Sequence, residues 1–137
     1  MKHMTKQELQ QYTHLRRERD QIARLLEALE CKMQDPRAAQ LDAMPRGGTP
    51  DGSATERMVE QHDELLRRYR SKLDELDAAQ LAIETAVAAL PHREATLIRM
   101  HYIEGMTWEQ VAVALAYTWR HVHRIHSDAL QLLQAQT

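Results

Sequence analysis

The sequence is short of the residues that build a bulky core or a cross-linked one. It has no Phe, and aromatic side chains make up only 4% of its 137 residues. The single cysteine, Cys31, excludes a framework of disulfides and fits a reducing compartment. Hydrophobic residues still reach 43%. This balance favours long helices with seams of Leu and Ala, and the length allows one domain or a small domain on a helical stalk.

Targeting signals and membrane-spanning runs are also missing from the sequence. The N-terminus has no apolar stretch of the kind that a signal peptide needs. No apolar run approaches the length of a membrane span. We therefore expect a cytoplasmic protein with no membrane partner.

Residues arranged for catalysis or metal binding are scarce. Cys31 is alone, and no serine lies in a nucleophile motif. His123 and His126 have a spacing that can chelate zinc, but no Cys or carboxylate completes a ligand set nearby. Arg46 lies in a Gly-rich stretch without the Lys-Ser or Lys-Thr ending of a nucleotide-binding loop. We therefore expect no enzyme, no cofactor and no metal site.

Proline and glycine gather between two segments with helical periodicity. Residues 35–54 hold most of both, which predicts a flexible loop. Before it, over about residues 5–34, apolar side chains recur at three- and four-residue steps, at Leu15, Ile22, Leu26, Leu29 and Met33. After it, over about residues 55–90, a heptad seam runs through Val59, His62, Leu66, Tyr69, Leu73, Leu76, Gln80, Ile83, Val87 and Leu90.

These two helices predict an all-α stalk over residues 1–90. The loop is long enough for the helices to fold back antiparallel, or to pair with another subunit. We expect a long antiparallel helical hairpin packed as a coiled coil. Because the seam is longer than one small domain needs, we also expect a homodimer held by the long helices.

Residues 91–137 carry the punctuation of three short helices. Pro91 suits a first helical position, and Gly105 suits a left-handed stop just past a helix end. Thr107 and Gln110 form a capping box, and Thr118 caps the next helix. A short helix, a tight turn and a longer helix give the spacing of a helix-turn-helix, which places its second helix in the DNA major groove.

The two faces of this predicted helix-turn-helix differ in chemistry. The expected core side chains are Val111, Ala112 and Leu115 on the first helix and Val122, Ile125, Ala129 and Leu132 on the second. Ala112 is small enough for the closest approach of the helices, and Tyr117 is apolar enough to fill the turn. The side chains expected to face outwards are Trp119, Arg120, His121, His123, Arg124 and Ser127.

Outward donors and cations suit double-stranded DNA. We expect Arg120, His121 and Arg124 to read base edges, with Arg favouring guanine, and Trp119 to pack on sugar or a thymine methyl. His123 belongs to the same candidate surface. Thr107 and Thr118, at helix N-termini, orient backbone N–H groups towards phosphates.

The overall charge of the chain does little to attract DNA to this surface. The net charge is −2, and from Pro91 onward the arginines are balanced by acidic residues. A strongly basic footprint is therefore lacking, and we expect weak DNA binding by one copy. A second copy or RNA polymerase would strengthen it.

The last third of the chain resembles region four of bacterial sigma factors. The resemblance rests on Leu90-Pro91-His92-Arg93-Glu94, Tyr102 to Thr107, Val111-Ala112, Val122 to Ile125 and Ala129-Leu130. It implies binding of the promoter −35 element through the second helix and contact with the RNA polymerase flap. Two departures stand out. Ala116 replaces a common glycine, which suggests a slightly different turn. His101 replaces a common arginine, which removes one phosphate or polymerase contact.

The rest of the chain is similar to small phage and prophage regulators, including late activators of the RinA and ArpU type. Met44 to Gly48 resembles their Pro-Arg-Gly-Gly loop. We therefore expect a sequence-specific DNA-binding transcriptional regulator, encoded by a phage or prophage and located in the cytoplasm of a bacterial host cell. The alternatives are a phage small terminase subunit, which packages DNA, and a module that binds RNA polymerase without reading DNA.

Overall fold

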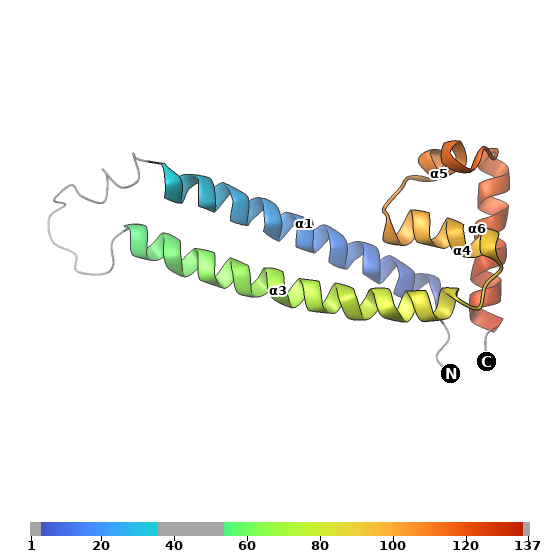
Figure 1. The fold of residues 1–137 in the computed structure, drawn as a ribbon, viewed down its shortest axis with the longest axis horizontal. Coiled ribbons are helices and arrows are strands. Elements are labelled where there is room, and N and C mark those ends of the chain that lie inside the picture. Colours follow the sequence, from blue (N-terminus) through green and yellow to red (C-terminus); the bar gives the residue numbers. More distant parts are fainter. Residues whose placement is uncertain (1–3, 36–53, 136–137) are drawn as a thin grey trace, which may run out of the picture. The chain divides into compact units, whose positions relative to one another are not determined.

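Every element in the described part of the chain is helical. The computed structural model describes residues 4–35 and 54–135, in the order α1 (Lys6–Gln34), α3 (Ala54–Val87), α4 (His92–Ile98), the π-helical segment η1 (Arg99–Ile103), α5 (Trp108–Leu115) and α6 (Trp119–Ala135) (Figure 1). Two long helices followed by a helix-turn-helix confirm the predicted all-α fold. The predicted loop falls almost wholly outside the described residues. None of the described helices has the length and apolar character to cross a bilayer.

Local hydrogen bonds set the ends of the long helices. The Thr5 hydroxyl accepts from the Glu8 N–H at 3.2 Å and the Glu8 carboxylate accepts from the Thr5 N–H at 3.1 Å, which is a capping box for α1. Helix α3 ends at Val87, three residues before the predicted end at residue 90. Pro91 follows in an extended conformation, with ψ of 154°, and occupies the N-cap of α4 rather than its first helical position.

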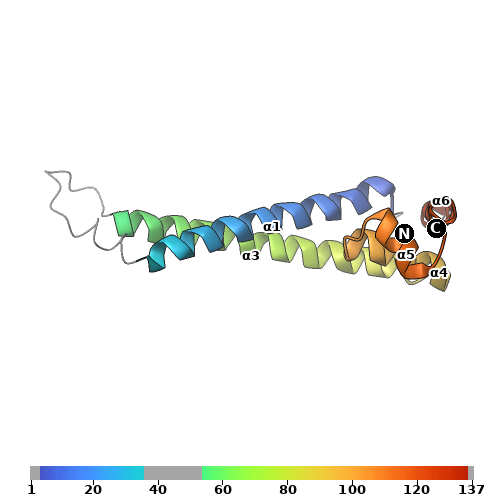
Figure 2. The same ribbon diagram turned by 90° about the horizontal axis from the view of Figure 1, so that it is seen from above.

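The described residues pack into two compact units. Residues 17–35 and 54–74 form the hairpin unit, in which α1 and α3 lie side by side and antiparallel (Figures 1 and 2). Glu18 pairs with Lys72 at 2.6 Å, and Glu30 pairs with His62 at 3.0 Å. The predicted seam is therefore used within one chain, where it buries Leu26 and Leu29.

The prediction that Val59 and Met33 pack between the two long helices is wrong. Val59 is 43% exposed and Met33 is 37% exposed. Both lie at the end of the hairpin unit next to the undescribed segment, beyond the hydrogen bond between Glu30 and His62. The homodimer that the seam suggested stays a prediction.

The helix-turn-helix unit combines the ends of both long helices with the C-terminal helices. It contains residues 4–16 and 75–135. Helix α6 packs on α4 and on α5. The shared core consists of Met4, Leu9, Tyr12, Leu76, Ile83, Val87, Leu90, Ala95, Leu97, Ile98, Tyr102, Val111, Val122, Ile125, Ala129 and Leu133. Leu9 and Tyr12 are core residues that were not predicted. That residues 91–137 form a domain of their own stays a prediction.

Two seam positions in this unit differ from expectation. Leu132 is 41% exposed while Leu133 is fully buried, because buried steps of three and four residues from Val122 reach position 133. Gln80 is exposed, and the small Ala79 packs against the core in its place.

The segment η1 widens the helix that begins at α4. The Glu104 N–H donates to the Arg99 carbonyl at 2.9 Å, a five-residue step typical of a π-helix. Arg16, from α1, then closes its C-terminal end by donating to the carbonyls of Tyr102 and Ile103 at 3.4 and 2.6 Å. Gly105 follows with φ of 76°, as predicted, and the Arg16 guanidinium lies where a Cβ would stand.

Candidate nucleic-acid interface

Helix α5 begins with the predicted capping box. The Thr107 hydroxyl accepts from the Gln110 N–H at 3.1 Å, and the Gln110 side chain accepts from the Thr107 N–H at 2.9 Å. Both donors would otherwise be left without a partner in the first turn. Thr107 is exposed and keeps its place at the helix N-terminus.

The turn between α5 and α6 is built on an alanine in the left-handed conformation. Ala116 has φ of 57° and ψ of 39°. The Tyr117 N–H donates to the Ala112 carbonyl at 3.0 Å, and the Ala116 N–H donates to the Val113 carbonyl at 3.2 Å. The expectation of a different turn in the absence of glycine is therefore wrong. The alanine adopts the backbone conformation that favours glycine, at a steric cost.

Replacing Ala116 by Gly should stabilise the protein. Relief of the left-handed strain gains about 1–2 kcal/mol, and the extra freedom of glycine in the unfolded chain takes back about 0.4–1 kcal/mol. The free energy of unfolding should rise by about 1 kcal/mol in urea denaturation. Ala114→Gly is the control, because Ala114 is exposed inside α5 and should lose about 1 kcal/mol. Destabilisation by both changes would show that Ala116 carries no relievable strain.

Helix α6 presents one exposed stripe opposite its buried one. The Thr118 hydroxyl accepts from the His121 N–H at 3.1 Å, which confirms the predicted cap. The buried stripe is formed by Val122, Ile125, His126, Ala129 and Leu133. Arg120, Arg124 and Ser127 are exposed at four- and three-residue steps on the other side. The two guanidinium groups therefore lie on one accessible line of α6.

Three other predicted contact residues cluster at the start of α6 with different exposures. Trp119 is 58% exposed. The His121 ring is half-buried and meets the Tyr117 ring edge-on at 4.7 Å. His123 does not face outwards, contrary to prediction. Its ring lies 3.9 Å from Trp119 and 5.3 Å from Trp108, and its Nε2 is buried with no hydrogen-bond partner within the described residues.

A group of aromatic rings from η1 and α5 packs against α6. His101 stacks on Trp108 at 3.6 Å with planes 13° apart, and its Nδ1–H donates to the Met106 carbonyl at 2.8 Å. Trp108 also meets His126 at 4.5 Å. His101 is therefore a packing residue that joins η1 to α5. This packing role accounts for a histidine at the position where region four commonly has an arginine.

Two buried members of this group, Tyr102 and His126, are joined by a hydrogen bond. The Tyr102 hydroxyl and Nε2 of His126 lie 2.7 Å apart. Burial lowers the pKa of His126 to about 4 and raises the pKa of Tyr102 to about 12. Burial also lowers the pKa of His101. His126 is therefore neutral near pH 7 and adds no charge to α6.

The structure separates the predicted site residues into two sets. Thr107, Thr118, Trp119, Arg120 and Arg124 are exposed, whereas His121 and His123 are half-buried in ring contacts. Trp108, Tyr102 and His126, which support the site, were not predicted. The signal in the sequence was a histidine, His126, on the same side of α6 as the apolar residues. Among the described residues, no group of three or more His, Cys, Asp or Glu is placed to hold a metal.

Residues 86–135 match the family model for Sigma-70, region 4. The match runs from the end of α3 to the end of α6, and so includes the whole turn between α5 and α6. The comparisons with curated proteins and with solved structures gave no match. The match to region 4 indicates a DNA-binding function associated with transcription for residues 86–135.

Proposed function

We propose that this chain is a sequence-specific transcriptional regulator that reads double-stranded DNA with α6. The observation that carries the proposal is the exposed line of Arg120, Arg124 and Ser127 on a helix whose opposite side is buried. Such a helix fits the major groove, where Arg recognises guanine through paired hydrogen bonds. The region-4 match supports the same helix as the reader.

The ends of the two helices favour a supporting contact with the DNA backbone. Thr107 and Thr118 each accept a hydrogen bond from one first-turn N–H, which leaves other N–H groups of that turn pointing out of the helix. Helix N-termini stabilise phosphate. Trp119 is exposed at the first position of α6, where its ring can cover a sugar or a thymine methyl.

The proposal extends to origin and partner. Two arginines on the exposed line supply a small electrostatic term, so one copy binds DNA weakly. RNA polymerase is the partner that a region-4 match favours. The resemblance of the rest of the chain to small phage and prophage regulators favours a phage or prophage origin.

A second candidate is a module that binds RNA polymerase without reading DNA. It is favoured by the region-4 match itself, because domains of this class bind RNA polymerase as well as DNA.

Selection from a random DNA pool tests the proposal. We expect the full chain to enrich a defined sequence, and bacterial RNA polymerase to strengthen its footprint on that sequence. A pool that stays random with the protein alone, together with binding of the protein to polymerase, would replace the proposal by the second candidate. A pool that stays random without any polymerase binding would reject both.

A further inference from the structure

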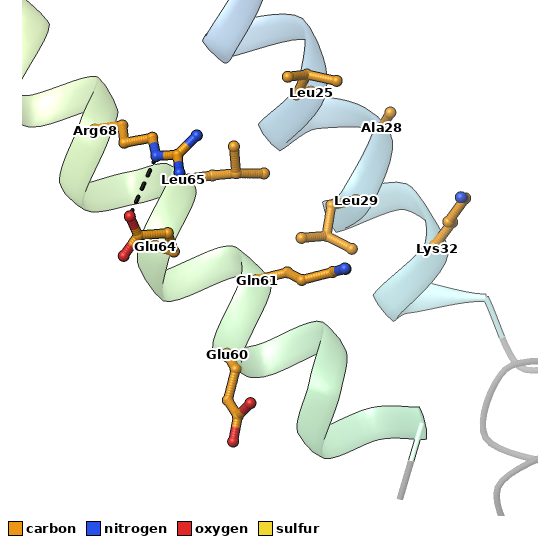
Figure 3. Close-up of a pocket in the computed structure, with 9 residues that line it drawn as sticks. All are labelled: Leu25, Ala28, Leu29, Lys32, Glu60, Gln61, Glu64, Leu65 and Arg68. Carbon is orange, nitrogen blue, oxygen red and sulfur yellow. Dashed lines mark hydrogen bonds and ion pairs between the residues drawn. The ribbon is translucent and has the colours of Figure 1, made fainter.

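The hairpin unit has an open groove along one side, between α1 and α3 (Figure 3). Its volume is about 550 Å³. Leu25, Ala28 and Leu29 come from α1 and Leu65 comes from α3, which gives the groove an apolar floor. The polar lining residues are Lys32, Glu60, Gln61, Glu64 and Arg68.

This groove leaves apolar surface uncovered in a unit that buries little. Leu26 and Leu29 are the side chains that the described hairpin unit buries, at 7% and 8% exposure. Leu25 is 50% exposed beside them. Two helices cover only one flank of each apolar stripe, and a helical bundle of four covers both. The groove is therefore suited to another pair of helices.

We propose that the groove is the dimer interface and that a second copy of this chain fills it. A two-fold axis along the hairpin sets α1 of one copy against α3 of the other. Leu25 of each copy then enters the groove of its partner. Because both copies use the same surface, the exposed Leu25 of each copy contacts the groove of the other.

The charges on the rim fit this arrangement. The hydrogen bond between Glu30 and His62 puts Lys32 and Glu60 at the same level along the hairpin, on α1 and α3 respectively. In the two-fold pair, Lys32 of each copy faces Glu60 of the other. Within the described residues, neither side chain has an ion pair of its own, whereas Glu64 already pairs with Arg68 at 3.2 Å.

Charge exchange between two variants tests the interface in the full chain. Lys32→Glu places carboxylates opposite each other, and Glu60→Lys places ammonium groups opposite each other. Each variant alone should dimerise about tenfold more weakly than wild type in sedimentation equilibrium, because like charges face each other twice. An equimolar mixture should recover near wild-type association as a mixed dimer. Pairing of positions 32 and 60 within one chain cannot produce that recovery, because each variant chain carries the same charge at both positions.

Leu25→Asp gives a second, stronger test. It should weaken association more than 100-fold, because a carboxylate enters an apolar groove. Leu81→Asp is the matched control, because Leu81 is 70% exposed and lies outside the groove, so association should persist. Helix content from circular dichroism identifies any variant that unfolds. A monomeric wild type at tens of micromolar, a dimer that survives Leu25→Asp, or a mixture that fails to recover would each overturn the proposal. No DNA is added, so this result stands apart from the proposed function.

Discussion

Replacing Arg120 and Arg124 together by Ala should abolish sequence-specific DNA binding and leave the helix-turn-helix folded. Both side chains are exposed on the same side of α6, away from the buried stripe. Each single change should cost about 1–3 kcal/mol on the selected sequence if the guanidinium pairs with a base edge. The double change should cost about the sum if the two contacts are independent. Fluorescence anisotropy with labelled DNA measures these losses.

The salt dependence of binding separates base contacts from phosphate contacts. An arginine on a phosphate would weaken all sequences equally and lower the slope of log affinity against log salt by about one. An arginine on guanine would instead relax the preference at one base pair. Arg124→Lys keeps the charge and removes the planar fork, so it should behave like Arg124→Ala only for a base contact.

Arg70→Ala provides the charge-matched control for these variants. Arg70 is exposed on α3, and its removal changes the net charge by the same amount. Affinity and selectivity should stay at wild-type values, and circular dichroism should be unchanged for all variants. If the double variant also keeps wild-type affinity and selectivity, α6 does not read the DNA sequence. That outcome would favour the candidate that binds RNA polymerase without reading DNA.

The parts of the site that were predictable are those set by near neighbours in sequence. The capping box of Thr107 and Gln110, the cap by Thr118 and the positive φ of Gly105 each depend on hydrogen bonds or backbone conformation within a few residues. Such patterns leave a local signature of residue types. The buried stripe of α6 was predictable for the same reason. Its last position was missed because Leu132 and Leu133 are adjacent and equally apolar.

The parts that were missed depend on contacts between distant residues. Arg16 donates to carbonyls in η1, 86 and 87 residues away in the sequence. His123 was expected outside because it does not belong to the apolar steps of Val122 and Ile125, but the ring of Trp108 on another helix covers it. Whether a histidine between two apolar steps is exposed is decided by what packs above it. Composition and periodicity do not carry that information.

Acidification should destabilise the helix-turn-helix unit well before its carboxylates are fully protonated. His126 has a pKa of about 4 in the folded protein against 6.5 for an ordinary histidine. Between these values the unfolded chain binds a proton that the folded protein refuses. The stability contribution is therefore fully present above pH 6.5 and is lost as the pH falls from 6.5 towards 4.

The expected size of this effect is large for one residue. The difference between the two pKa values corresponds to about 3 kcal/mol, of which about 2 kcal/mol should be lost by pH 5. The lowered pKa of His101 acts in the same direction. Urea denaturation at several pH values between 7.5 and 4.5 measures the free energy of unfolding directly.

His126→Gln isolates the contribution of this histidine. Glutamine has no titration in this range and can still reach the Tyr102 hydroxyl, so its stability should fall less steeply with pH than that of wild type. Tyr102→Phe is the matched variant: it removes the 2.7 Å hydrogen bond and should cost about 1 kcal/mol at every pH. Its pH slope should stay steep, because burial is the cause of the lowered pKa of His126. Equal slopes for wild type and His126→Gln would mean that another group is responsible for any loss in acid.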